Sequence, residues 1–356
     1  WEKYYPSQLC IMSPKNETTV LVLSLLITLG VVGGGLWLFT SRPGLNLGGG
    51  VQNQTKQPQQ SNFVESFAKV QNVPAGLFNY GGSTTWAPMR KDIDPAIQTV
   101  WPEFQLRYTS PAIGAPGSGT GIKMLLDNQL AFAQSSRSIK NEEYQQASQR
   151  GFTLKEIPVA IDGIAIAVNP NLNLPGLTVA QIKDIYTGKL TNWNQVGGPN
   201  LPITPYSRRK EEGGTIEFFV ENILEGGNFG ANVQFIPTTT QALQKLASNP
   251  GGIYYASAPE VVPQCGVKSL PVGRQANEMV PPYQEPFVPV SQCPGKRNQL
   301  NAEAFKSGQY PITRRLFVIV KQNGQDDQRA GEAYANLLLT NQGQDLITKT
   351  GFVRIR

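Results

Sequence analysis

The stretch at residues 206–224, YSRRKEEGGTIEFFVENIL, joins a polar loop to an apolar run whose spacing predicts a helix. Gly213 and Gly214 permit a sharp turn just before that run opens at Ile216. The start of a helix presents unpaired N–H donors and a partial positive charge. We interpret this stretch as an anion-binding site. An ordinary exposed turn with a series of solvated charged residues would show the same pattern. This stretch alone therefore does not distinguish an anion-binding site from an exposed turn.

The composition excludes several classes of function. The chain has 356 residues, of which 40% are hydrophobic, enough for one or two domain-sized cores. Its net charge is +6, but only 16% of its residues are charged, which favours a small anion over nucleic acid as the partner. It contains no histidine, which excludes Ser-His-Asp and Cys-His catalysis. The three cysteines lack metal-ligand spacing, so we expect no metal site. We also expect no cofactor.

An uncharged run at residues 20–39, VLVLSLLITLGVVGGGLWLF, is long enough to cross a bilayer as a helix. A cleaved signal peptide is the alternative, but no small-x-small cleavage site follows the run. We predict a cytoplasmic segment at residues 1–19 and a transmembrane anchor or uncleaved signal at residues 20–39. Lys3 and Lys15 before the run favour an N-terminus inside the cell. Met12 is a candidate for the true start of the chain.

Residues 40–73 are predicted to form a flexible linker. Most of this segment is rich in Gly, Gln and Asn and nearly free of large apolar residues, so it cannot bury a core. Phe63, Val64, Phe67 and Val70 then recur at helical spacing, which indicates a short lead-in helix before the domain itself. The linker would hold a globular domain close to the membrane.

Residues 74–356 alternate short apolar runs with amphipathic segments, which is the pattern of an α/β fold. Three predicted strands, at residues 77–80, 105–109 and 130–134, each end in small or hydroxylated residues. The junctions read GGSTTWAP, SPAIGAPGSGTG and SSRS, and a helix from about residue 122 to 128 follows the second. The carboxyl ends of parallel strands are where ligands bind in such sheets. Helix capping and tight loops explain each junction equally well when it is taken alone.

Six motifs, in their order and spacing, carry a specific resemblance. GGSTTWAP is followed by GSGTGIK, AFAQSS, IPVAIDGIAIAVN, LTVAQIKDIYTGKLTNW and RRKEEGGT. Together they resemble the periplasmic phosphate-binding protein of the high-affinity phosphate ABC transporter, over essentially all of residues 75–356. The resemblance implies a two-lobed periplasmic-binding-protein fold of type II. Each lobe would be a mixed α/β sheet flanked by helices, and one oxyanion would lie in the cleft.

The resemblance also divides the domain. Residues 74–162 would form the first part of lobe 1, residues 163–310 would form lobe 2, and residues 311–356 would return to lobe 1. In that family two strands cross between the lobes. Here residues 157–169 would cross into lobe 2, and residues 311–320 would lead back.

The residues that contact phosphate in that family match positions in this chain. They are Thr84, Thr85, Ser118, Arg209, Gly213, Gly214 and Thr215. Thr85 would use its backbone N–H as well as its hydroxyl. Glu211 stands where the family has an acidic partner that orients the arginine. Family members more often have a serine at this position. Gly213 keeps the backbone N–H donor but lacks the serine hydroxyl.

One position departs from the family pattern. The family places an aspartate after its third strand, where it accepts the proton of monohydrogen phosphate and repels sulfate, but this chain has Ser136 there. A buried acceptor that meets no proton costs several kcal/mol, so such an aspartate discriminates strongly against an anion without a proton, such as sulfate. Either Ser136 accepts the proton and selectivity is softer, or Asp162 near the crossing strand supplies the missing carboxylate.

The resemblance implies a receptor that captures inorganic phosphate and delivers it to the permease subunits of an ABC transporter. It would lie in the periplasm, at the outer face of the cytoplasmic membrane, held by the N-terminal helix or released if that helix is cleaved. It would have no catalytic residues and bind no nucleic acid. A receptor for another tetrahedral oxyanion, such as sulfate or arsenate, is an alternative. A phosphate-ester hydrolase on the same lobes would need a nucleophile with a base, or a metal, in a chain without histidine.

Other segments have structural interpretations. Cys265 and Cys293 bracket a proline-rich excursion, and we expect them to form a disulfide in an oxidising compartment. Thr178 is predicted to cap a helix within residues 177–193. Residues 238–257 are predicted to form a capped helix followed by a buried strand.

Overall fold

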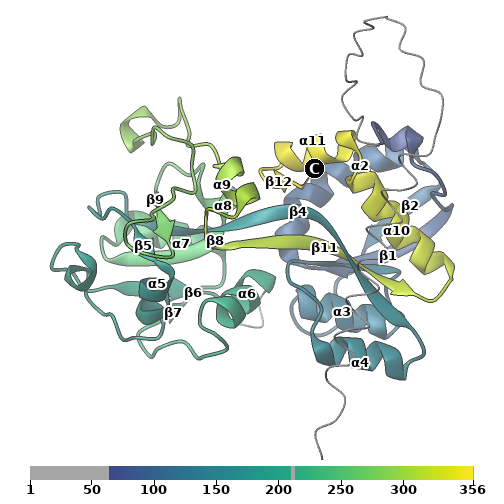
Figure 1. Ribbon diagram of the computed structural model, residues 1–356, viewed down its shortest axis with the longest axis horizontal. Coiled ribbons are helices and arrows are strands. Elements are labelled where there is room, and N and C mark those ends of the chain that lie inside the picture. The colour runs from purple at the N-terminus through teal and green to yellow at the C-terminus, as the bar shows by residue number, and fades with distance from the viewer. Residues whose placement is uncertain (1–63, 210–212, 356) are drawn as a thin grey trace, which may run out of the picture. The chain divides into compact units, whose positions relative to one another are not determined.

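A computed structural model of the chain describes residues 64–209 and 213–355 (Figure 1). The predicted cytoplasmic segment, the membrane span and most of the linker fall in residues 1–63, outside the described part. Within the described part, no helix combines the length and the apolar character needed to span a bilayer.

One ten-stranded sheet forms the frame of the domain. Its strands lie in the order β2 (Phe104–Tyr108), β1 (Gly76–Gly82), β3 (Phe132–Ser135), β11 (Thr313–Gln322), β4 (Thr153–Val168), β8 (Gly252–Ser257), β6 (Thr204–Ser207) and β7 (Gln234–Phe235), with β9 (Lys268–Leu270) and β12 (Val353–Arg354) also paired to β4. Strand β1 pairs in parallel with β2 and β3, and β6 pairs in parallel with β7 and β8. The central pair β4 and β11 is antiparallel. The predicted mixed α/β fold is therefore confirmed.

Two long central strands join the halves of the sheet. Strand β4 has 16 residues and β11 has 10, so β4 spans roughly 50 Å at about 3.3 Å per residue. The two strands pair with each other as far as Gly163 opposite Thr313, and from Ile164 onward β4 pairs with β8 and β9. Figure 1 shows both strands passing between two groups of helices. The predicted crossing at residues 157–169 and the predicted return at residues 311–320 fall largely on β4 and β11.

Buried side chains form separate cores on the two sides of this crossing. One core, which we call lobe 2, uses residues between Ile164 and Ile312, together with Val353. The others, which we call lobe 1, use residues within 67–160 and 316–352. The change of core therefore falls within β4 and near the start of β11. Burial of apolar surface is the main stabilising contribution in each lobe.

Helices cover both lobes. Lobe 1 has α2 (Ala87–Val100), α3 (Ser118–Leu126), α4 (Asn141–Gln149), α10 (Asp326–Leu338) and α11 (Asn341–Lys349), and lobe 2 has α5 (Val179–Tyr186), α6 (Gly214–Asn222), α7 (Thr239–Ser248), α8 (Ala258–Val261) and α9 (Ala302–Ser307). Thr178 caps α5 by accepting a hydrogen bond from the backbone N–H of Gln181, which confirms that prediction. Helix α3 begins at Ser118, earlier than predicted, so Ser118 occupies its first turn.

The domain begins earlier than the sequence analysis predicts. Phe67 and Val70 are buried in lobe 1, and Phe67 opens the short 3-10 helix η1 (Phe67–Lys69). The backbone carbonyl of Phe67 accepts a hydrogen bond from the indole N–H of Trp101. The short helix η1 lies where the sequence indicated a lead-in helix, and it packs on lobe 1 rather than standing in a linker, because burial of these apolar side chains is more favourable than their solvation.

Cys265 and Cys293 form a disulfide, which confirms that prediction. The bond joins residues 28 positions apart, and closing a loop of this length stabilises a fold by about 3 kcal/mol. We expect the double variant Cys265→Ser/Cys293→Ser to lose about that much free energy of unfolding in urea denaturation. Reductant should lower the stability of the wild type to the same level and leave the variant unchanged. Equal stability of wild type and variant without reductant would contradict this expectation.

Candidate anion-binding site

The first turn of α6 depends on two consecutive glycines. Helix α6 starts at Gly214, and its N-cap Gly213 has a φ of 154°, a value that side-chain-bearing residues rarely adopt. A Cβ atom on Gly213 would lie 3.3 Å from the hydroxyl oxygen of Thr84 and 3.7 Å from Nη1 of Arg208. Thr84 belongs to lobe 1 and Arg208 to lobe 2, so both lobes meet at this turn. The first N–H groups of a helix lack partners within it, and they carry a partial positive charge.

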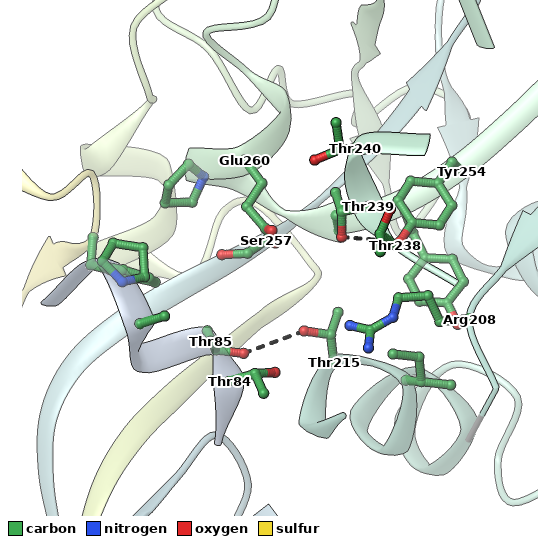
Figure 2. Close-up of a pocket in the computed structure, with 17 residues that line it drawn as sticks. Thr84, Thr85, Arg208, Thr215, Thr238, Thr239, Thr240, Tyr254, Ser257 and Glu260 are labelled. Carbon is green, nitrogen blue, oxygen red and sulfur yellow. Dashed lines mark hydrogen bonds between the residues drawn. The ribbon is translucent and has the colours of Figure 1, made fainter. Parts of the chain in front are cut away.

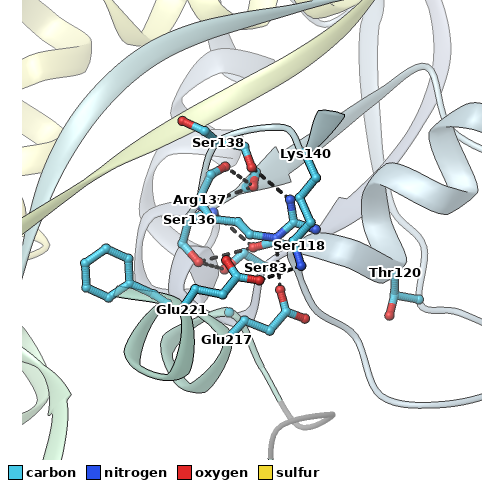
Figure 3. Close-up of polar contacts among 12 residues, drawn as sticks. Ser83, Ser118, Thr120, Ser136, Arg137, Ser138, Lys140, Glu217 and Glu221 are labelled. Carbon is cyan, nitrogen blue, oxygen red and sulfur yellow. Dashed lines mark hydrogen bonds and ion pairs between the residues drawn. The ribbon is translucent and has the colours of Figure 1, made fainter. Parts of the chain in front are cut away.

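Three buried serines pack against the same turn (Figure 3). The Ser83 hydroxyl donates to Ser136 Oγ over 3.0 Å, and Ser118 Oγ lies 3.2 Å from Ser136 Oγ. Ser118 Oγ also accepts the backbone N–H of Ser136 at 3.0 Å. A Cβ atom on Gly214 would overlap the Ser118 and Ser136 hydroxyls. Glycine is therefore required here for the start of α6 to approach the serine cluster, which is Ser83, Ser118 and Ser136.

We expect Gly214→Ala to lower the free energy of unfolding by roughly 1–3 kcal/mol, as overpacking of a buried contact does. The added methyl would lie 2.7 Å from the Ser118 hydroxyl oxygen, which forces the lobes apart at this point. Urea denaturation measures the change. The control is Gly266→Ala, where the nearest atom would be Ala247 Cβ at 3.7 Å. Equal effects of the two substitutions would show that the contact at Gly214 is not tight.

Arg314 on β11 links this turn to the crossing strands. It lies opposite Asp162 on β4, and its Nη2 and Nε atoms are 2.8 and 3.0 Å from Asp162 Oδ2. The same guanidinium donates to the hydroxyls of Thr85 and Thr215, over 3.1 and 2.8 Å, and to the carbonyl oxygen of Gly214 over 3.1 Å. Both members of the ion pair are buried. Arg314 thereby connects lobe 1, lobe 2 and the crossing strands through one side chain.

Asp162 is held by protein groups on both oxygens. Its Oδ1 accepts from the Ser257 hydroxyl at 2.5 Å, and its Oδ2 accepts from Arg314. Burial raises the pKa of Asp162, and the Arg314 guanidinium opposes that rise. The backbone N–H of Ala258 is a further donor to this carboxylate, so Ser257, Ala258 and two Arg314 nitrogens fill about four acceptor sites. The arrangement therefore gives no support to the hypothesis that Asp162 supplies the carboxylate missing at Ser136.

Ion pairs form a second bridge between the loop after β3 and α6 (Figure 3). Arg137 pairs with Glu143 at 2.8 Å and with Glu217 of α6 at 3.1 Å. Lys140 pairs with Glu221, one turn further along α6, at 2.5 Å. Arg137 is buried, so its pairs are screened from solvent far less than those of surface charges. These contacts hold the flank of α6 to lobe 1 beside the serine cluster.

A pocket of about 400 Å³ opens beside the first turn of α6 (Figure 2). Its polar side chains are Thr84, Thr85, Arg208, Thr215, Thr238, Thr239, Thr240, Ser257 and Glu260, and its rings include Tyr254 and Tyr255. Phe219 of α6 stacks on Tyr255 of β8 with ring centroids 3.6 Å apart, which positions α6 against the pocket wall.

The structure brings most of the predicted contact residues to this place. Thr84, Thr85 and Thr215 line the pocket, and Ser118, Ser136, Gly213 and Gly214 lie at the adjoining turn of α6.

Arg209 is placed differently from the other predicted residues. Its side chain is exposed, and its guanidinium carbon lies 5.2 Å from the ring centroid of Phe235. The preceding residue, Arg208, lines the pocket instead. Glu211, the predicted partner of Arg209, lies outside the described residues. Consecutive residues in an extended segment point to opposite sides, so a shift by one position exchanges the two arginines.

Arg314 and Glu260 were not predicted as site residues. A signal existed for Arg314, because it precedes the buried Leu316 by two positions on one strand and therefore shares its face, whereas Arg315 between them is exposed. Glu260 gave no signal, since an acidic residue near the start of a short helix is ordinary. The described residues contain no group of three or more His, Cys, Asp or Glu side chains that could hold a metal ion.

A family model described as a PBP superfamily domain matches residues 69–342. The chain belongs to the PBP superfamily. Protein SphX of Synechococcus elongatus is 27% identical to this PBP-superfamily chain over 269 residues, which cover 73% of the chain and 74% of the relative. The phosphate-binding protein PstS of Pseudomonas aeruginosa is 25% identical over 307 residues, which cover 82% and 86%.

Two solved structures have a similar architecture. A protein from Clostridium perfringens, proposed as the substrate-binding protein of a phosphate ABC transporter and solved with bound phosphate, has a TM-score of 0.61 and 25% identity, covering 79% of this chain and 100% of that one. An ABC-type phosphate transport receptor from Vibrio cholerae also has a TM-score of 0.61, at 20% identity, covering 78% and 99%. At this identity, the similarity to the Vibrio cholerae receptor shows the fold alone.

Proposed function

We propose that this PBP-superfamily protein is a receptor that binds inorganic phosphate outside the cytoplasmic membrane and delivers it to the permease subunits of an ABC transporter. The observation that carries the proposal is the meeting of Thr84, Ser118, Ser136 and Arg208 at the glycine turn of α6, from segments far apart in the chain. The relative named phosphate-binding protein PstS and the Clostridium perfringens protein with bound phosphate support the choice of ligand. The receptor would carry out no chemistry on its ligand.

The groups at this turn suit a desolvated oxyanion. Backbone N–H groups at the start of α6 and one guanidinium, that of Arg208, would replace the water around the anion. Arg314 donates to the hydroxyl oxygens of Thr85 and Thr215, so each hydroxyl keeps its own proton for another acceptor. The two hydroxyl oxygens lie 3.4 Å apart, and at least one of their protons can face the pocket. Arg314 would therefore position donors for the anion without touching it.

Ligand entry would use the crossing strands as a hinge. The start of α6 packs tightly on the serine cluster, so a tetrahedral anion could contact the Ser118 and Ser136 hydroxyls together with this turn only if the lobes part along β4 and β11 and then close again. Donors come from both lobes, and a ligand that contacts both lobes stabilises the closed state.

The serine cluster bears on selectivity. Ser136 is neutral, and its hydroxyl is already bonded to Ser83 and Ser118, so no carboxylate at this position repels sulfate. We therefore expect a smaller preference for phosphate over sulfate than an aspartate at this position would give.

Calorimetric titration of the full chain with phosphate, arsenate and sulfate at two pH values tests the proposal. Phosphate and arsenate should bind, with sulfate weaker but measurable. Binding of sulfate without phosphate would replace the proposed ligand with another tetrahedral oxyanion. Release of chromophore from a chromogenic phosphate ester would instead indicate a hydrolase.

The N-terminal anchor is part of the same proposal. Residues 20–39 would hold the receptor at the outer face of the membrane, or the receptor would be released if they are cleaved. Fractionation of cells that export the full chain distinguishes a membrane-bound product from a shortened soluble one. A full-length product that remains in the cytoplasm would contradict the location.

A further inference from the structure

The pocket is larger than inorganic phosphate requires. Its volume of about 400 Å³ equals that of roughly 13 water molecules at about 30 Å³ each. Phosphate has only five non-hydrogen atoms. A pocket of this volume leaves space beside a bound phosphate for an organic group. Figure 2 shows Thr84, Thr85, Thr215 and Arg208 around one part of the pocket, with Glu260 and Ser257 at another.

The second part of the pocket carries a carboxylate. Glu260 on α8 lines the pocket, and its side chain is reached by solvent through it. The pocket walls limit the hydration of the Glu260 carboxylate and so raise its pKa, and the nearby charge of Asp162 adds to this rise. A carboxylate that shares a pocket with a bound dianion repels it, unless the ligand presents a hydrogen-bond donor to the carboxylate.

Glu260 also has a structural role that leaves it capacity for a ligand. It is the third residue of α8, and its carboxylate accepts a backbone N–H from Ser257, as acidic residues at this helix position often do. An ionised carboxylate offers about four acceptor sites on its two oxygens. Acceptor sites therefore remain for donors on a ligand.

Hydroxyl groups and rings line the rest of the pocket. Thr238, Thr239 and Thr240 lie at the start of α7, and Thr239 Oγ1 is 3.3 Å from the Tyr254 hydroxyl. Hydroxyls both donate and accept, so they match the hydroxyl groups of a polyol. Tyr254 and Tyr255 supply apolar ring surface for its C–H groups.

We propose that this pocket also binds phosphate monoesters of small polyols, with the phosphate at the first turn of α6 and the hydroxyl groups of the ester donating to Glu260. This inference rests on the proposed function, because the phosphate end would occupy the proposed anion site. Glu260 would then determine specificity for the organic part of the ligand.

Calorimetry on the full chain tests this inference with glycerol 3-phosphate, inorganic phosphate and glycerol as probes. The wild type should bind glycerol 3-phosphate and not glycerol. Glu260→Gln should weaken glycerol 3-phosphate binding at least tenfold, because the amide replaces one acceptor with a donor. It should tighten inorganic phosphate binding, because it removes a negative charge that repels the dianion. Glu303→Gln, an exposed position on α9, should change neither.

The outcomes separate this inference from the proposed function. Binding of inorganic phosphate without glycerol 3-phosphate overturns the inference and leaves the proposed function standing. Equal weakening of both ligands by Glu260→Gln also overturns it, because Glu260 would then act on the phosphate group itself. Binding of neither probe by a folded wild type overturns both proposals.

Discussion

Arg314→Ala should lower the free energy of unfolding by about 3–5 kcal/mol, because it leaves a buried carboxylate without its partner. Asp162 is only 1% exposed, so water cannot replace the guanidinium that pairs with it. The substitution also removes the donors to Thr85, Thr215 and the Gly214 carbonyl. Urea denaturation of wild type and variant in phosphate-free buffer measures the loss.

The neighbouring arginine provides a matched control. Arg315 lies next to Arg314 on β11, but it is exposed on the opposite face, so Arg315→Ala should change stability by less than about 0.5 kcal/mol. The double variant Asp162→Leu/Arg314→Met should recover much of the loss, because apolar residues of similar volume often replace a buried ion pair without cost. If Arg314→Ala were no more costly than Arg315→Ala, the buried pair would not be needed for the fold.

Arg208→Ala should weaken phosphate binding by on the order of 4 kcal/mol, about a thousandfold in Kd. The Arg208 side chain lines the pocket, and its Nη1 approaches the position that a Cβ atom on Gly213 would take. Removal of the guanidinium would leave the dianion with neutral donors alone. Calorimetric titration with phosphate measures the loss, and urea denaturation checks that the variant is folded.

Arg209→Ala is the control for this second prediction. Its guanidinium lies over Phe235 and is exposed, so its removal should cost less than about 1 kcal/mol of binding. The opposite ranking, with a large loss at Arg209 and a small one at Arg208, would restore the assignment made from the sequence. The pair of variants thus decides which of two adjacent arginines contacts the anion.

Much of the fold and part of the site could be predicted from the sequence. Strands β1, β2 and β3 were predicted near their observed places because each apolar run is bounded by glycine or hydroxylated residues. The junctions after these strands supply Thr84, Ser118 and Ser136, and the first turn of α6 supplies Gly213 and Gly214. Each of these residues lies at the end of a strand or the start of a helix, where the local backbone favours glycine or a hydroxylated residue, so the local sequence pattern predicts its position.

The remaining features depend on packing between distant segments. The pairing of Arg314 with Asp162 follows from the register of β4 and β11, which pattern alone does not provide. The choice between Arg208 and Arg209 depends on a one-residue register at the end of β6. The burial of Phe67 depends on a surface of lobe 1 that several segments build together. Each of these is a contact over long sequence separation.

Arg314 connects the stability of the fold to the proposed binding site. The side chain that neutralises Asp162 between the crossing strands also orients two threonine hydroxyls from opposite lobes. Arg314 contacts both hydroxyls itself, so the arrangement of these donors would not depend on contact with the anion. Such preorganisation lowers the cost of ordering groups on binding.

The most direct test is a crystal structure of the full chain grown with phosphate. It should show the anion at the first turn of α6, within hydrogen-bond distance of backbone N–H groups of Gly214 or Thr215, the Thr84 hydroxyl and the Arg208 guanidinium. Phosphate bound elsewhere, or this turn without phosphate at a saturating concentration, would contradict the account.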